Sequence, residues 1–139
     1  MIEDQGGKRN WPCPCCGFDT FDEPPGSYAS CPICFWDDDA VQLRWPELRG
    51  GANHVSLIDG QRNFVLVGAS DPRLRAHCRM PRVGESIEPG WRPVDPQLDN
   101  YEREFGGVPA LWPDDLDALY WWRRTYWRKP VGGVGVGVS

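Results

Sequence analysis

Two Cys-Pro-x-Cys units constrain this sequence more than any other feature. The first contains Cys13 and Cys16, the second contains Cys31 and Cys34, and 14 residues separate them. In such a unit both sulfurs lie on one tight turn, where they can face a single ion while backbone amides surround them. Two units in one short segment predict four thiolates on one metal ion. We expect zinc, and iron is the alternative, because the pattern suits both metals.

The residues between the two units have the pattern of a hairpin. Residues 18–21 alternate apolar and polar side chains, residues 23–26 read Glu-Pro-Pro-Gly, and residues 27–30 return as a partner strand. The sequence therefore predicts a small zinc ribbon with rubredoxin-like knuckles. Gly17 can take the positive φ that closes such a turn. Phe35 stands at the equivalent place in the second unit, where a Cβ is disfavoured, so we expect a looser turn there.

Several further motifs accompany the cysteines at fixed spacings. They are CPCCG at 13–17, DEPPGSY at 22–28, CPICFW at 31–36, Asp38, VQ at 41–42, GGAN at 50–53 and SL at 56–57. With these motifs, residues 10–70 resemble the bacterial cysteine-rich CPCC family. The resemblance implies a small metal-binding domain and no particular biochemical activity.

Composition predicts a loop-rich α+β fold. Fourteen prolines and 16 glycines in 139 residues are too many for a helical bundle, and a loop-rich domain gains stability from a bound metal. Ser56 fits a helix N-cap and Gly68 a helix end, so we expect one helix over 57–67, packed against the ribbon, after an irregular segment over 41–52. A Pro-rich connector then leads to two C-terminal helices, over 97–105 and from 113 to 129.

These patterns divide the chain into three parts. We expect a metal-ribbon domain over 10–70, the connector and helical extension over 71–130, and a flexible tail over 131–139.

The cysteines and the N-terminus together predict a cytosolic protein. Residues 1–10 lack the apolar stretch of a secretory signal, and no apolar run approaches the ~20 residues of a membrane span. In a reducing compartment six cysteines serve as metal ligands and free thiols. A disulfide scaffold is the alternative, but the regular spacing of the two units argues against it.

Charge and aromatic residues predict the kind of partner. Residues 1–60 carry ten acids and four bases, net −6, and an acidic surface repels the phosphates of a nucleic acid. We therefore expect a zinc-binding module that binds another macromolecule, most readily a protein. The candidate partner-binding residues are Trp122, Arg123, Tyr126 and Trp127 in the C-terminal helix. Two other interpretations remain: nucleic-acid binding through Arg123, Arg124, Arg128 and Lys129, and a stripe that packs on the protein's own core.

Cys15 is the best candidate for a reactive residue. It lies between two expected ligands, where backbone amides and the metal could depress its pKa, so a redox-sensitive thiol or a thiol oxidoreductase is an alternative function. A fifth, inert sulfur is the other interpretation. The only histidines are His54 and His77, and four thiolates leave no open position on the metal for water. We therefore do not expect catalysis.

Overall fold

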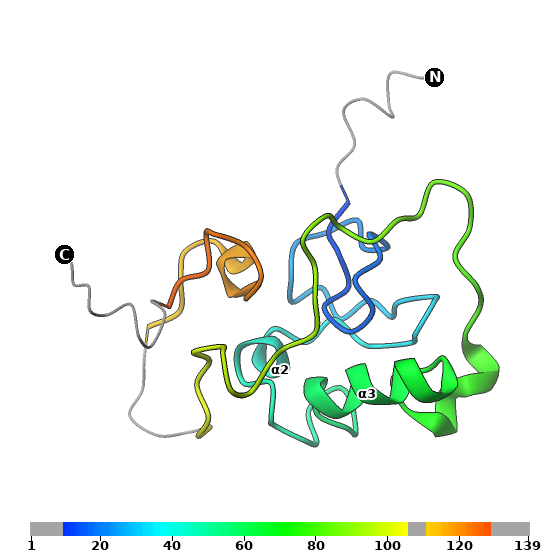
Figure 1. The fold of residues 1–139 in the computed structure, drawn as a ribbon, viewed down its shortest axis with the longest axis horizontal. Helices are drawn as coiled ribbons and strands as arrows, with labels where there is room; N and C mark the ends of the chain where they lie inside the picture. Colours follow the sequence, from blue (N-terminus) through cyan, green and yellow to red (C-terminus); the bar gives the residue numbers. More distant parts are fainter. Residues whose placement is uncertain (1–9, 106–110, 129–139) are drawn as a thin grey trace.

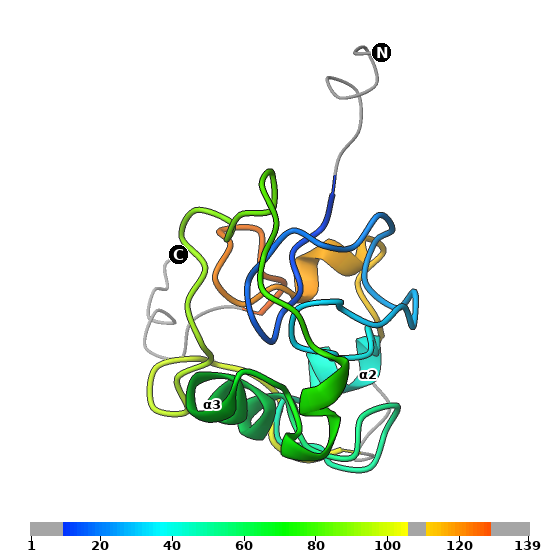
Figure 2. The same ribbon diagram turned by 90° about the vertical axis from the view of Figure 1, so that its right-hand side faces the viewer.

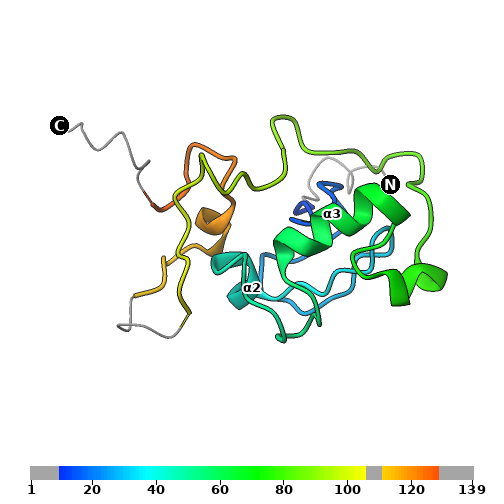
Figure 3. The same cartoon turned by 60° about the horizontal axis from the view of Figure 1, so that its bottom comes forward.

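The computed structural model describes residues 10–105 and 111–128. It contains the α-helices α2 (Ala40–Arg44) and α3 (Leu57–Val67) and the 3-10 helices η1 (Pro72–His77) and η2 (Leu116–Leu119). Helix α2 lies against η2, and α3 lies against η1. Figures 1 and 3 show η1 and η2 at opposite ends of the molecule, and Figure 1 shows the loops of residues 10–39 above the α-helices. No helix in these ranges has the length and apolarity needed to cross a membrane.

The predicted hairpin between the two cysteine units is wrong. The described ranges contain no β-strand and only three isolated antiparallel bridges: Trp11 with Phe21, Phe18 with Ile87, and Ser30 with Asp37. Trp11 and Phe21 exchange both backbone hydrogen bonds, at 2.7 and 3.1 Å. Each cysteine unit thus joins its own two flanks, because closing a short loop costs less entropy than pairing one unit with the other. The α+β assignment fails with the hairpin.

Helix α3 forms where the sequence predicts it. Ser56 is the N-cap, and its hydroxyl oxygen accepts a hydrogen bond from the Asp59 backbone N–H at 3.0 Å. Gly68 ends the helix with φ +79° and donates its N–H to the Phe64 carbonyl. Both signals are local in the sequence, so neither depends on distant contacts.

The segment between the cysteines and α3 is more regular than predicted. Helix α2 occupies part of the expected irregular segment, because Asp39 caps it by accepting hydrogen bonds from the N–H groups of Val41 and Gln42.

Neither of the two predicted C-terminal helices forms over its predicted range. Residues 97–105 contain only turns and bends, and from 113 to 128 the one helical element is η2. The Trp127 N–H donates to the Ala118 carbonyl at 2.9 Å, which closes a loop in place of further helical turns. The predicted tail over 131–139 lies outside the described residues, as does the candidate nucleic-acid contact Lys129.

Described residues beyond position 85 pack on one another and against the cysteine-bearing half. The Tyr120 hydroxyl donates to the Pro12 carbonyl at 3.1 Å, and the indole N–H of Trp121 donates to the Arg92 carbonyl at 3.1 Å. Tyr120 is fully buried, as is Trp36 of the second cysteine unit. Figure 2 shows the C-terminal segment in orange behind the blue N-terminal loops. One apolar core therefore joins the two halves.

Candidate metal centre

Four cysteine sulfurs converge in the centre of the core. The Sγ atoms of Cys13 and Cys34 lie 3.6 Å apart and those of Cys16 and Cys31 lie 3.8 Å apart. All four sulfurs lie within 4.8 Å of one another, and the four residues are 0–2% exposed. Sulfurs at about 2.3 Å from a tetrahedral zinc ion are separated by about 3.8 Å, whereas disulfide sulfurs are separated by about 2.05 Å. The cluster therefore fits one metal ion, and all six cysteines are free thiols.

The first cysteine unit is a tight turn closed by backbone hydrogen bonds. The Gly17 N–H donates to the Cys13 carbonyl at 2.7 Å, and the Cys13 N–H donates to the Phe18 carbonyl at 2.8 Å. Gly17 has φ +86°. A Cβ on Gly17 would lie 2.6 Å from the Trp91 ring, so glycine serves both the turn and the close approach of that ring.

The second unit repeats this turn without a glycine. The Phe35 N–H donates to the Cys31 carbonyl at 2.7 Å, and the Cys31 N–H donates to the Trp36 carbonyl at 2.8 Å. Phe35 takes φ +66°, so the looser turn expected here is wrong. The Phe35 ring stacks on His77 with centroids 5.1 Å apart, a contact that offsets part of the backbone strain.

The electrostatics of the cluster require a cation if all four sulfurs are ionised. Hydrogen bonds from Cys13, Cys16 and Cys34 hold the pKa of Cys31 far below its usual range, and the Thr20 hydroxyl adds another at 3.2 Å. Burial raises the pKa of Cys13 and that of Cys34. These shifts favour the charged form of Cys31 and the neutral forms of Cys13 and Cys34. A divalent cation would displace the remaining protons.

Cys15 is not one of the four clustered cysteines, and its sulfur lies between Cys34 and α3. It is buried, and its Sγ lies 3.3 Å from the position that a Cβ on Gly60 would occupy. Burial raises its pKa, the opposite of the depression that a reactive thiol needs. The structure gives the redox hypothesis no support.

The four predicted partner-binding residues lie against the protein itself, partly buried. The indole N–H of Trp122 and the guanidinium of Arg123 both donate to the Glu88 carboxylate, at distances of 2.6–2.8 Å. Tyr126 is half-buried, and burial raises its pKa to about 12. Trp127 packs on Arg44, whose guanidinium carbon lies 4.7 Å from the ring centroid. A partner at these residues stays a prediction, and what they contact here is the protein's own chain.

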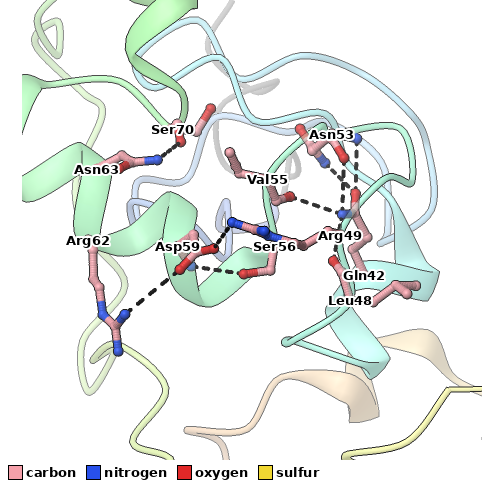
Figure 4. Close-up of polar contacts among 10 residues, drawn as sticks. All are labelled: Gln42, Leu48, Arg49, Asn53, Val55, Ser56, Asp59, Arg62, Asn63 and Ser70. Atoms are coloured by element: carbon pink, nitrogen blue, oxygen red, sulfur yellow. Dashed lines mark hydrogen bonds and ion pairs between the residues drawn. The ribbon is translucent and has the colours of Figure 1, made fainter.

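Sequence reasoning missed a buried polar network beside the second unit. Gln42 is fully buried, and its amide donates to the carbonyls of Leu48, Asn53 and Val55 at 3.0–3.2 Å. Asn53 returns two hydrogen bonds to the Gln42 side-chain oxygen and exchanges two with the Asp37 backbone. Figure 4 shows Gln42 and Asn53 facing one another across this loop. Their motifs, VQ and GGAN, were the available signal, but spacing alone did not show that they meet.

A comparison with known families gives one match. A family model described as cysteine-rich CPCC matches residues 11–85. The matched segment contains all four clustered cysteines together with α2, α3 and η1. A comparison with curated proteins finds no match.

Proposed function

Because the chain belongs to the cysteine-rich CPCC family, and because four of its thiols converge at metal-binding distance, we propose that it binds one zinc ion as a structural element. The sulfur geometry carries this proposal. The separations of 3.6 and 3.8 Å match the edges of a tetrahedral thiolate site. The ligands are almost fully buried, so the ion would have no open position for water or substrate.

The test of metal identity is elemental analysis of the purified protein. We expect one zinc per chain, and iron in its place would overturn the choice of metal but not the site. Replacement by cobalt(II) adds a geometric readout, because a tetrahedral four-thiolate site gives cobalt strong visible absorption.

Two cysteine variants form a matched pair for the site itself. Cys13→Ser removes a ligand, and we expect it to lose the metal and to unfold, since metal binding and folding are coupled in small sites. Cys15→Ser changes a sulfur of the same turn that lies outside the four-sulfur cluster, so it should retain one metal per chain. Equal metal loss in both variants would contradict the assignment of ligands.

The folded protein also presents surface suited to a protein partner, and a cytosolic protein-binding module is the second part of the proposal. Phe105, Leu111 and Trp112 are exposed, and the rings of Phe105 and Trp112 both pack edge-on against Trp45. Exposed aromatic clusters of this kind are typical of binding surfaces. Nucleic-acid binding has less support, because Arg123 is engaged by Glu88 and Arg128 by Asn100.

The partner proposal is tested by cross-linking capture with the Leu111→Glu variant beside the parent chain. A specific protein partner should be captured by the parent and lost with the variant, and its binding should change little with salt. A captured nucleic acid, released steeply as salt rises, would contradict this part of the proposal and leave the metal site untouched.

A further inference from the structure

A groove runs along α3, between this helix and residues 93–96. Its volume is about 410 Å³, within the range of about 300–1,000 Å³ typical of small-molecule sites. One wall is formed by α3 through Ile58, Val65 and Leu66, and the other by Pro93, Val94 and Pro96. Val65 and Leu66 remain 79% and 78% exposed. Most of the groove is therefore apolar surface open to a ligand.

Hydrogen bonds within the protein fix the two walls of the groove relative to one another. Gln61 is buried, and its side chain joins the two walls: the amide oxygen accepts from the Val94 N–H at 3.0 Å, while the amide nitrogen donates to the Pro14 carbonyl at 3.0 Å. The Trp121 indole fixes the same wall through the Arg92 carbonyl. A preformed apolar site binds without first ordering its walls, which favours affinity.

Among the described residues, Arg62 is the one cation that lines the groove. Its side chain is 69% exposed, and its ion pair with Asp59 is long, at 3.8 Å. Asp59 is also engaged by Arg49 at 3.3 Å, and Figure 4 shows the Asp59 carboxylate between the two arginines. The Arg62 charge is therefore only weakly neutralised.

Two acids close in sequence to the opposite wall, Asp95 and Asp99, do not line the groove and accept hydrogen bonds within their own turn. Asp99 accepts two hydrogen bonds from the Arg92 guanidinium, at 2.6 and 2.8 Å, and one from the Asp95 N–H. Asp95 accepts from the Gln97 N–H. These contacts leave an apolar groove with a positive charge at its edge.

We propose that this groove binds a small apolar carboxylate, with its hydrocarbon body between α3 and residues 93–96 and its carboxylate on Arg62. The site is separate from the cysteine cluster and does not depend on the identity of the metal. The ligand class follows from the chemistry of the lining. An apolar body would cover Val65, Leu66 and the two prolines, and a carboxylate would form an ion pair with Arg62.

The test titrates decanoate into the full chain as purified, below its micelle-forming concentration, by calorimetry and by amide chemical shifts. We expect saturable binding with shifts at Val65 and Leu66. Decanol should bind more weakly, and decyltrimethylammonium more weakly still, because the latter places like charge beside Arg62.

Arg62→Gln and Arg49→Gln form the matched pair for this test. Both arginines are exposed, 69% and 73%, and both contact Asp59, but Arg49 does not line the groove. Arg62→Gln should weaken decanoate binding about fivefold, as loss of an exposed ion pair does, and leave decanol binding unchanged. Arg49→Gln should bind decanoate like the parent. Absence of saturable decanoate binding, equal affinity for decanol, or an equal loss in both variants would each overturn the proposal.

Discussion

Phe35 occupies the position in the second cysteine turn that Gly17 occupies in the first. The two turns have the same backbone conformation there but different side chains. Phe35 holds φ +66°, where the first turn has Gly17 at φ +86°. A residue with a Cβ pays about 1–2 kcal/mol in this region. The ring is half-buried and stacked on His77, and such pairs contribute about 0.5–1.5 kcal/mol. The ring contact and the backbone strain are therefore of similar size.

Two substitutions at Phe35 separate the strain from the ring contact. Phe35→Ala and Phe35→Gly both remove the ring, but only glycine removes the Cβ. We expect the glycine variant to exceed the alanine variant by about 1 kcal/mol in free energy of unfolding, measured with denaturant at saturating zinc. An alanine variant as stable as the glycine variant would show that the strain is absent.

At this scale the sequence predicts which residues converge but not every conformation. Each Cys-Pro-x-Cys turn holds two sulfurs, and two such turns in one short segment were sufficient to predict that Cys13, Cys16, Cys31 and Cys34 converge. The contact made by the Phe35 ring was not predictable in the same way. Its partner His77 lies in η1, more than 40 residues further along the chain.

Among the elements, α3 carries a glycine where helices usually avoid one. Gly60 is buried and faces the cysteine cluster. A Cβ there would lie 3.3 Å from the Cys15 sulfur and 3.3 Å from the Trp36 ring. The absence of a side chain lets α3 approach the first cysteine unit closely. Glycine at this position lowers the helix propensity of α3 but allows the helix to pack closely against the core.

Gly60→Ala should therefore not give the increase in stability that is usual for replacing a glycine inside a helix by alanine. An interior glycine-to-alanine change raises helix stability by about 1 kcal/mol in open surroundings. Here we expect the overpacked Cβ to make the variant about 1–2 kcal/mol less stable than the parent in denaturant unfolding.

The same change in a Cys15→Ala background tests the cause. With the Cys15 sulfur gone, the added methyl group has more room, so Gly60→Ala should cost less, with an interaction energy above about 0.5 kcal/mol. Additive effects would place the clash on Trp36 alone.

Elements defined by local signals were predictable, and elements defined by distant contacts were not. Ser56 and Gly68 fix both ends of α3 through neighbours within four residues. The hairpin gave way to pairing within each cysteine unit, and residues of its first predicted strand and of the C-terminal helices contact remote residues. Phe18 bridges to Ile87, and Trp122 and Arg123 turn toward Glu88. Tertiary contacts of this kind override local propensity.

At the scale of the whole molecule, one buried arginine joins the family-matched segment to the residues beyond it. The guanidinium of Arg44 lies 4.5 Å from the ring centroid of Trp45, 4.6 Å from that of Trp112 and 4.7 Å from that of Trp127. It also forms an ion pair with Glu102 at 2.5 Å. Three of these four partners come from the C-terminal part of the chain, so a single side chain of α2 holds segments that are distant in sequence.

Arg44→Ala should detach the C-terminal part from the metal-binding part. Removing one member of a largely buried ion pair costs about 3–5 kcal/mol, and the three rings also lose their cation. Because that loss is a large share of the stability of a small domain, we expect protease to cleave residues 86–128 of the variant rapidly while the metal content stays at one per chain. Tryptophan emission should shift to longer wavelength as the rings become hydrated.

Arg44 and the rings of Trp45, Trp112 and Trp127 form a cage. Arg44→Lys and Arg49→Ala decide whether this cage or the positive charge alone holds the C-terminal part in place. Lysine keeps the charge but cannot present a planar guanidinium to three rings or a bidentate contact to Glu102, so it should restore only part of the protease resistance. Arg49 is exposed and lies outside the cage, so Arg49→Ala should resist protease like the parent. If Arg44→Ala also resists like the parent, the C-terminal part is held by other contacts, such as the hydrogen bond from Tyr120 to the Pro12 carbonyl. The packing of Arg44 between the three rings then adds nothing to docking.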